Sequence, residues 1–532
     1  MSRVASRVRV PALVIGSGIA GLASALALAK RGVRVLLLTK AAEPDDCNTR
    51  HAQGGIIYFG KRDSPASLGR DIVSAGAGLC NAEAVRFLAR EGPRVVEEIL
   101  IGDAGVPFTR TREGDLDFTR EGAHSVARIV HSADATGKAI ELALLARVRR
   151  EPGVRIWTDA TAVDLITARH HSTDVQQRYA LQDPCLGAYV LDDDGVHTVL
   201  ADFTVLATGG VGRLFLHTTN TKHAIGDGLT MAARAGAAVL NLEYVQFHPT
   251  TLYHPDAERF LISEALRGEG AVLVNRSGEA FMPRYDRERK DLAPRDVVTR
   301  AIVEEMTTRG ETCVYLDLAH HFEGKGRTAI RDRFPTIAAT CAKFGIDIAA
   351  EPIPVVPAAH YFCGGVLADL EARTTIRNLY AVGEVSCTGL HGANRLASTS
   401  LLEGLVWGAH AARSIAERVE KGHVFPPSMF RAIPDWKAPG NARNEDPALI
   451  QQDWTTIRNT MWNYVGIVRT GERLGRAVAD IRDLEKRLSR FYHETKISRE
   501  IVDLIHGVHA SHLIALAALK NPVSRGCHYR RN

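Results

Sequence analysis

A glycine-rich turn near the amino terminus constrains the fold more than any other feature of this chain. Gly16–Gly21 reads Gly-Ser-Gly-Ile-Ala-Gly, follows an apolar run over 10–15 and precedes a helical pattern over 22–30. Glycines at these spacings permit a tight turn, a close approach of the backbone to a pyrophosphate, and close packing of helix on strand. An apolar run over 33–38 completes a β-α-β unit with a right-handed crossover. The sequence therefore predicts a Rossmann-like dinucleotide-binding domain.

The same stretch also has features of a targeting or membrane segment. Residues 11–29 are uncharged and mostly apolar behind a basic start with Arg3, Arg7 and Arg9, as in a signal peptide or membrane anchor. The glycines divide this run into strand, turn and helix, which favours nucleotide binding. No other uncharged run in the sequence is long enough to span a bilayer. We therefore expect a cytoplasmic protein without a membrane segment.

Composition excludes several classes of function. A chain of 532 residues that is 45% hydrophobic and 24% charged can form three or four domain-sized units with a large core. The net charge of +5 is small for this length and argues against nucleic-acid binding, which needs a clustered basic face. The eight cysteines include no Cys-x-x-Cys pair, which predicts free thiols in a reducing cytosol and no metal site.

Two segments in the middle of the chain concentrate groups that suit a small anion. Gln246–Thr250 reads Gln-Phe-His-Pro-Thr, and Ser263–Gly270 reads Ser-Glu-Ala-Leu-Arg-Gly-Glu-Gly. With three later segments they supply five cationic or potentially cationic side chains: His248, Arg267, Arg295, His360 and Arg395. Arginine forms paired hydrogen bonds with carboxylates, and histidine is a tunable donor. Beside a dinucleotide site, this set indicates redox chemistry on a short dicarboxylate gripped at both ends.

The residues at the end of the second strand leave the dinucleotide open. Thr39-Lys40 stands where an acidic residue is expected. A lysine there could meet the 2′-phosphate of NADP. The next segment favours FAD instead, because Asn48–Gly55, which reads Asn-Thr-Arg-His-Ala-Gln-Gly-Gly, is similar to the flavin-approaching segment of a flavoprotein family that also carries Ser/Thr-Lys at this strand end.

These motifs, in this order, resemble the fumarate reductase/succinate dehydrogenase flavoprotein superfamily, and within it the L-aspartate oxidases. The resemblance runs from Pro11 to Tyr529 and includes the terminal segment 524–529. It implies FAD-dependent oxidation of L-aspartate to iminoaspartate. The acceptor would be O2, giving H2O2, or fumarate, giving succinate. This is the first step of NAD biosynthesis through quinolinate, which makes quinolinate synthase a functional partner.

The resemblance also implies which residues contact FAD. Asp227 lies in a Gly-Asp-Gly segment similar to a cofactor-contacting segment of the family, and Glu384 would hold a ribitol or ribose hydroxyl. Ser400 and Leu401 would open a helix, running to about 420, whose positive end stabilises negative charge on reduced flavin. The full set of expected cofactor residues is Gly16, Ser17, Gly18, Ile19, Ala20, Gly21, Lys40, Asn48, Thr49, Arg50, His51, Ala52, Gln53, Gly54, Gly55, Asp227, Glu384, Ser400 and Leu401.

Two positions separate the oxidases from their respiratory relatives. Asn48 stands where those relatives carry the histidine that bonds covalently to FAD, and His51 is too close to Gln53 to replace it. The resemblance therefore implies noncovalent FAD. Glu121, within Arg-Glu-Gly-Ala-His-Ser over 120–125, resembles the glutamate that faces the substrate amine. An α-ammonium needs an anionic partner, whereas succinate needs none.

The remaining expected roles also follow from the family. His248, Ser263, His360 and Arg395 would grip the two carboxylates, and Ser263 keeps the hydroxyl of the threonine that is more usual there. Arg295 resembles the proton-handling arginine, with a relay through Glu264 and Arg267. Arginine normally stays protonated, so the alternative role of Arg295 is to clamp and polarise the substrate. The sequence does not separate these two roles.

Strand-like runs on both sides of the dicarboxylate motifs predict a discontinuous domain. Residues 204–208 and 379–382 each precede a glycine and are aimed at the same ligand. From Ala448 apolar residues recur at three- and four-residue steps. We expect an α/β Rossmann-like FAD-binding domain over 1–240 and 358–425, an inserted α+β capping domain over 241–357, and, after a proline-rich linker, a C-terminal helical bundle over 426–532.

Two other functions remain open at this point. One is a fumarate reductase or succinate dehydrogenase flavoprotein subunit that works with an iron–sulfur partner; Asn48 and Glu121 argue against it. The other is a non-catalytic protein that binds FAD or docks on quinolinate synthase; the intact set of expected catalytic residues argues against it.

Overall fold

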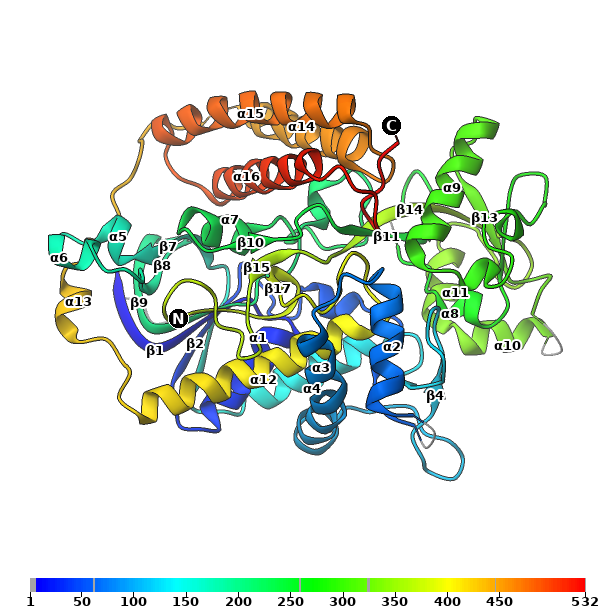
Figure 1. Ribbon diagram of the computed structural model, residues 1–532, viewed down its shortest axis with the longest axis horizontal. Helices are drawn as coiled ribbons and strands as arrows, with labels where there is room; N and C mark the ends of the chain where they lie inside the picture. Colours follow the sequence, from blue (N-terminus) through cyan, green and yellow to red (C-terminus); the bar gives the residue numbers. More distant parts are fainter. Residues whose placement is uncertain (1–5, 61–62, 258–259, 323–325, 445, 532) are drawn as a thin grey trace.

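A seven-stranded sheet forms the centre of the protein. The computed structural model (Figure 1) describes residues 6–60, 63–257, 260–322, 326–444 and 446–531. The strand order is β6-β2-β1-β9-β8-β7, and β16 pairs with β9. The strands are β1 (Arg7–Ile15), β2 (Val35–Leu38), β6 (Val154–Trp157), β7 (Thr161–Thr167), β8 (Cys185–Asp192), β9 (Gly195–Leu206) and β16 (Leu379–Ala381).

The strands that reach the glycine turn pair in parallel. Residues 12–15 of β1 lie beside 35–38 of β2 and 203–206 of β9, and 379–381 of β16 lie on the other side of β9. The carboxyl ends of four strands therefore meet at one edge, where parallel α/β sheets bind their ligands. Segments that precede and follow the inserted unit in the chain thus build a single sheet.

A layer of helices covers one face of this sheet. α1 (Ile19–Ala29) has ten buried residues because it is enclosed between the sheet and other helices, as its uniformly apolar sequence predicts. Its largest helix contact is with α12 (Thr399–Glu420). The layer is completed by α2 (Pro65–Ala75), α3 (Ala82–Val95), the π-helical turn η2 (Val96–Asp103) and α4 (Thr136–Val148).

The inserted unit has its own sheet and core. Its strand order is β11-β14-β13-β12, and helix α9 packs against β11. β14 runs through the boundary predicted at 357, so the inserted sheet extends to residue 362. The elements are β11 (Val245–Leu252), α8 (Ala265–Gly268), β12 (Val272–Val274), α9 (Arg295–Arg309), β13 (Val314–Asp317), α10 (Gly326–Arg333), α11 (Pro335–Ala342) and β14 (Ile353–Phe362).

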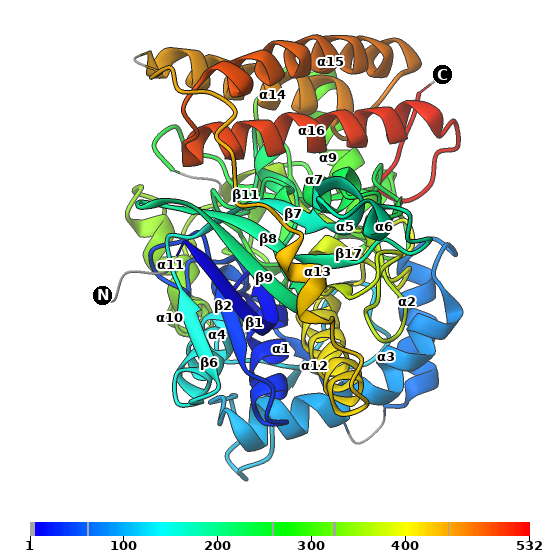
Figure 2. The same ribbon diagram turned by 90° about the vertical axis from the view of Figure 1, so that its left-hand side faces the viewer.

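Three long helices form a second layer on the opposite side (Figure 2). They are α14 (Pro447–Val465), α15 (Gly471–Glu494) and α16 (Arg499–Lys520). Each begins after a side chain that caps its first backbone amides, namely Asp446, Thr470 and Ser498. α16 also packs on α7 (Asp227–Arg234) of the central domain. By length and composition α16 could cross a membrane, but more than half of the qualifying window is buried in the protein, as in a core helix.

Shorter elements connect these layers. α13 (Pro427–Arg431), within the predicted linker, places Phe430 in an apolar cluster with residues of β7, β8 and β9. The others are β3 (Ile56–Ile57), β4 (Phe118–Thr119), β5 (Ile129–Val130), α5 (Ala168–His171), α6 (Val175–Arg178), β10 (Val239–Leu240), β15 (Gly365–Leu367), β17 (Ser386–Cys387), and the 3-10 turns η1 (Asn48–His51), η3 (Gly212–Leu214), η4 (Met282–Arg284), η5 (Lys290–Leu292) and η6 (Gly383–Val385).

Candidate active site

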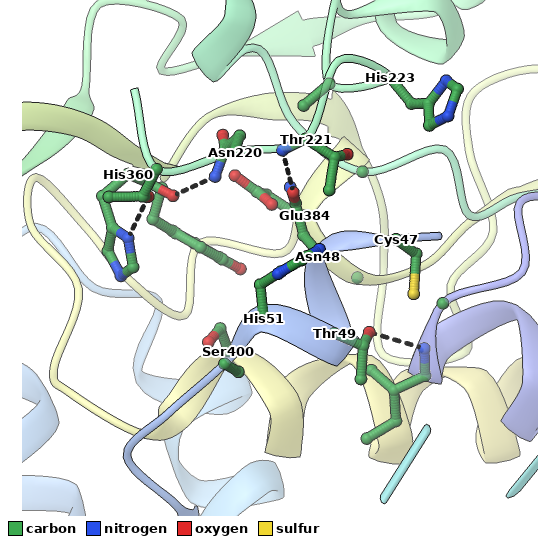
Figure 3. Close-up of a pocket in the computed structure, with 18 of the residues that line it drawn as sticks. Cys47, Asn48, Thr49, His51, Asn220, Thr221, His223, His360, Glu384 and Ser400 are labelled. Carbon is green, nitrogen blue, oxygen red and sulfur yellow. Dashed lines mark hydrogen bonds between the residues drawn. The ribbon is translucent and has the colours of Figure 1, made fainter. Parts of the chain in front are cut away.

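A cavity of about 990 Å³ extends from the glycine turn into the inserted unit. It is lined by the β1–α1 turn, by η1 and the residues that follow it, by 207–224, and by side chains of the inserted unit and of α12 (Figure 3). Among the residues predicted for the site, Gly21, Arg50 and Arg267 do not line this cavity, and all the others do. The structure therefore brings the expected cofactor and substrate residues together.

The glycine turn forms one end of the cavity. Gly16 has φ +114°, and a Cβ on it would lie 2.1 Å from the carbonyl oxygen of Ala207 on the adjacent strand. A Cβ on Gly21 would lie 1.9 Å from the carbonyl oxygen of Gly16, so Gly21 allows α1 to pack on the turn and is not itself at the cavity. The start of α1 faces the cavity, which suits a pyrophosphate.

Lys40 is already neutralised by two carboxylates. Its Nζ lies 3.0 Å from Asp227 and 3.4 Å from Asp503 of α16. Burial disfavours the charged amine, but the two carboxylates outweigh burial and raise the pKa of Lys40. A lysine engaged in this way is a poor receptor for a 2′-phosphate, which argues against NADP. No sequence pattern indicated a role for Asp503, which lies in the C-terminal helices.

The segment predicted to approach the flavin is fixed by polar contacts. Asn48 Oδ1 accepts a hydrogen bond from the Thr221 amide at 2.9 Å (Figure 3), and Thr49 Oγ1 accepts one from the Ile19 amide at 3.0 Å. Arg50 instead forms an ion pair with Asp45. Arg50 therefore pairs within its own turn, whereas Asn48 and Thr49 line the cavity and are held by residues distant in the sequence.

Two features at the middle of the cavity suit a flavin dinucleotide. Glu384 accepts a hydrogen bond from the Phe362 amide at 2.9 Å, and burial raises its pKa to about 7. Its carboxyl group lines the cavity and has remaining acceptor capacity for a hydroxyl. The first turn of α12 also lines the cavity with Ser400 and Leu401. This helix of 22 residues directs the positive end of its dipole there.

A buried amide bridges the two arginines at the other end. Gln246 Oε1 accepts from Arg295 Nη1 at 3.2 Å and from Arg395 Nη2 at 3.1 Å. Its Nε2 donates to Asn394 Oδ1 at 2.7 Å, which fixes the amide orientation, and Gln246 is 0% exposed. We did not predict this role for Gln246. The signal was its position in the Gln-Phe-His-Pro-Thr segment, two residues before a candidate histidine.

Arg395 has no carboxylate partner among the described residues. Its guanidinium stacks over the ring of Tyr361 at 4.5 Å and donates to Ser400 Oγ at 3.0 Å. Burial, with Arg295 nearby, lowers the pKa of Arg395 to about 10, which leaves it charged at neutral pH. A buried cation without an ionic partner is costly, so an anionic ligand is the natural complement.

The two candidate histidines are neutral donors. The rings of His248 and His360 lie 5.1 Å apart. Burial, and then the nearby cations, hold the pKa of each well below its ordinary value. Of the five potentially cationic side chains predicted for the site, the three arginines therefore carry a charge and the two histidines do not. A neutral imidazole donates one hydrogen bond without adding to the electrostatic repulsion between these groups.

Glu264 connects Arg295 with the third arginine, Arg267. It accepts from Arg295 Nε at 2.7 Å, and Arg267 Nη2 lies 3.8 Å from the same oxygen. Burial alone would raise the pKa of Glu264, but the two arginines bring it down to about 2. Arg267 lies behind the cavity wall, where its Nη1 donates to the Asp291 carbonyl. These three side chains form a continuous buried chain of charges.

Glu121 lies beside this chain at the cavity wall. Its Oε2 accepts from Ser398 Oγ at 2.7 Å, and the side chain is buried. Burial, followed by the nearby charge of Glu264, raises the pKa of Glu121. A Cβ on Gly54 would lie 2.2 Å from Glu121 Oε1, so glycine at this position makes room for the carboxylate. Glu121 can thus face a cation in the cavity.

Comparison with known proteins agrees with this geometry. The FAD binding domain family matches residues 12–401, and the fumarate reductase flavoprotein C-terminal family matches residues 454–532. L-aspartate oxidase 1 of Ralstonia nicotianae is 46% identical over 524 residues, which cover 98% of this chain and 94% of that protein. L-aspartate oxidase of Pseudomonas aeruginosa is 45% identical, with coverage of 97% and 94%.

Solved structures of respiratory flavoproteins have the same fold. A quinol fumarate reductase subunit of E. coli superposes with a TM-score of 0.87 at 27% identity, covering 99% of this chain and 92% of that one. Mycobacterium smegmatis Sdh1 superposes with a TM-score of 0.77 at 28% identity, covering 98% and 89%. The fold, with its FAD-binding and C-terminal parts, is therefore shared with fumarate reductase flavoprotein subunits.

Proposed function

The chain belongs to the L-aspartate oxidase family of FAD-dependent flavoproteins, and from this we propose how its cavity oxidises L-aspartate to iminoaspartate. Bound FAD supplies the hydride acceptor. O2, giving H2O2, or fumarate, giving succinate, then takes up the electrons. The reaction is the first step of NAD biosynthesis through quinolinate.

The residues present fit a noncovalently bound FAD. The glycine turn and the start of α1 would hold the pyrophosphate, and Glu384 would hold a hydroxyl of the ribitol or ribose. Asp227 Oδ1 is buried and has no hydrogen-bond partner among the residues that the structure describes, so a ligand hydroxyl or amine would satisfy it. Asn48 has no nucleophilic ring nitrogen with which to form a histidyl–flavin bond.

The proposal rests on the charges of two cavity residues, Arg395 and Glu121. Arg395 is a cation without an ionic partner in the described part of the chain, and Glu121 is a buried carboxyl with a raised pKa. L-aspartate has two carboxylates and one ammonium, so it complements both groups. Its ammonium would favour the ionised form of Glu121, which a plain dicarboxylate would not do.

We assign the two carboxylates to two ends of the site. Arg395 and His360 would hold one of them through charge-assisted hydrogen bonds. His248 and Ser263 would hold the other, because β11 and the segment that carries Ser263 are joined by hydrogen bonds between Thr250 and Ile262. Gripping both ends places the Cα between them, in a near-attack orientation.

Arg295 is positioned to handle the proton. Its Nε donates to Glu264, and Glu264 in turn contacts Arg267. We propose that protons pass along these three residues, since all three are buried and the Glu264 carboxylate contacts both guanidinium groups. The alternative is that Arg295 only clamps and polarises the substrate. The two roles differ in whether kcat or KM falls on substitution.

The respiratory flavoproteins remain the second candidate because they share the fold. Asn48 and Glu121 favour the oxidase. Iminoaspartate is an imine that water hydrolyses, so we propose a quinolinate synthase, acting in the same cytoplasm, as the functional partner that consumes it.

The test is release of H2O2 by the purified single chain with L-aspartate, using succinate as the control substrate. We expect peroxide with aspartate and none with succinate. Turnover that requires a quinone and a second subunit would instead identify a respiratory flavoprotein.

A further inference from the structure

A short segment at the cavity wall, residues 217–221, runs beside the strand that carries His360. The Ala359 amide donates to the His217 carbonyl at 2.9 Å, and the Thr219 amide donates to the Ala359 carbonyl at 3.0 Å. Asn220 Nδ2 donates to the His360 carbonyl at 3.1 Å (Figure 3). The 217–221 segment therefore fixes the backbone on which His360 is mounted.

The same segment contacts the imidazole itself. Thr219 Oγ1 lies 2.8 Å from His360 Nδ1, and either atom could be the donor. The surroundings decide between them. The Ala359 carbonyl already accepts from Thr218 Oγ1 at 2.9 Å and from the Thr219 amide, so both of its lone pairs are in use. It lies 3.5 Å from Thr219 Oγ1, the outer limit of a hydrogen bond, and the Thr219 hydroxyl proton is therefore directed to Nδ1.

A neutral imidazole has only one N–H. With Nδ1 accepting from Thr219, the proton of His360 is on Nε2. Among the described parts of the chain no group forms a hydrogen bond with this Nε2, and His360 lines the cavity. In the other tautomer, the lone pair of Nε2 would face a carboxylate and repel it.

We propose that Thr219 is a positioning residue for substrate binding: its hydroxyl holds His360 with the proton on Nε2, so that His360 donates to a substrate carboxylate. This inference rests on the proposed function, because it requires a dicarboxylate in the cavity. Thr219 would act through His360 and not by its own contact with the substrate. Its effect is to remove the energetic cost of choosing a tautomer when the ligand binds.

The experiment measures succinate binding to the oxidised holoenzyme by perturbation of the flavin spectrum. Succinate carries both carboxylates and lacks the ammonium of aspartate, so it probes the carboxylate contacts alone. Thr219→Val removes the hydroxyl at nearly constant volume, and we expect the Kd of succinate to rise about three- to tenfold, as for the loss of one neutral hydrogen bond. Thr219→Ser keeps the hydroxyl and should return the Kd to within about twofold of wild type.

The matched control is Thr251→Val. The Thr251 hydroxyl is also buried and donates to the Val356 carbonyl of β14 at 2.8 Å, and it forms no hydrogen bond with a histidine among the described residues. Its loss should leave the Kd of succinate unchanged. A Kd increase as large as that of Thr219→Val would mean that loss of any buried hydroxyl that contacts β14 weakens succinate binding, and it would overturn the inference. If Thr219→Val does not retain FAD, Thr219→Ala replaces it with the same expectation.

A double-mutant cycle separates positioning from general disruption. In a His360→Gln background, removal of the Thr219 hydroxyl should have no further effect on the Kd of succinate, since there is no tautomer to select. A wild-type Kd for Thr219→Val, or an additive effect in the His360→Gln background, would refute the role of Thr219. Failure of the wild-type protein to be reduced by L-aspartate would instead refute the proposed function, and the succinate titration does not depend on it.

Discussion

Replacing Glu121 with glutamine should separate aspartate oxidation from fumarate reduction. The amide has the same shape as the carboxylate, so it fills the space beside Gly54 and still accepts from Ser398. It has no charge to offer an ammonium. The substitution therefore changes the electrostatics of the site with little change in packing.

The magnitude follows from the burial of the side chain. Glu121 is 6% exposed, so solvent screens its contact with an ammonium only weakly. Loss of a charge-assisted hydrogen bond costs about 1.5–3 kcal/mol, which is about ten- to a hundredfold in kcat/KM for aspartate. Fumarate has no ammonium. Removing the negative charge of Glu121 should therefore leave kcat/KM for fumarate reduction within about twofold of wild type.

The assay compares kcat/KM of Glu121→Gln for aspartate oxidation and for fumarate reduction in the same preparation. Glu98→Gln, an exposed glutamate that pairs with Arg94, is the control and should change neither. Equal losses in both directions for Glu121→Gln would show that Glu121 does not recognise the amine.

Four further outcomes are expected. The pKa of Glu121 is raised above 4.5, and protonation at lower pH removes its charge. The kcat/KM for aspartate should therefore decrease with falling pH at a pH above 4.5. The pH profile of Glu121→Gln should lack this decrease. Arg295→Lys should lower the rate of flavin reduction at saturating aspartate severely if Arg295 transfers a proton, whereas a raised KM with near-normal rates would leave it as a clamp. After acid precipitation all the flavin should be in the supernatant. Flavin fluorescence that stays with the denatured polypeptide would contradict noncovalent binding of FAD. Arg128→Met should destabilise the protein by about 3–5 kcal/mol in chemical denaturation, because Arg128 is fully buried between Asp63 and Asp71; no loss of stability would show that the two carboxylates are satisfied without it.

Local sequence patterns predicted the nucleotide-binding part of the fold. The glycine turn, the flanking strands and α1 follow from short-range spacing, and the structure has β1, α1 and β2 in this order. The segments 204–208 and 379–382 were expected to be strands aimed at the same ligand, and the structure pairs β9 with β16 in parallel. The predicted boundary at 357 falls inside β14, which runs from Ile353 to Phe362, and no residue in this strand signals how far the inserted sheet extends.

The comparisons confirm the family, FAD as the cofactor and the aspartate oxidation that the motifs indicated. The roles of individual site residues stay predictions. Burial was not visible in the sequence, so His248 and His360 looked potentially cationic although their surroundings keep them neutral. Gln246 and Asp503 were missed because their partners come from other elements, and an amide or a carboxylate in isolation carries no sign of a partner far away in the sequence.

Anaerobic mixing of the oxidised protein with L-aspartate tests the central claim most directly. If the cavity transfers a hydride from the Cα of aspartate to FAD, the flavin absorbance will bleach without any other protein, electron acceptor or metal. Succinate, which lacks the ammonium that Glu121 is expected to recognise, should leave the spectrum of the oxidised flavin unbleached. A flavin that stays oxidised with aspartate, or that is reduced by succinate instead, would contradict the account.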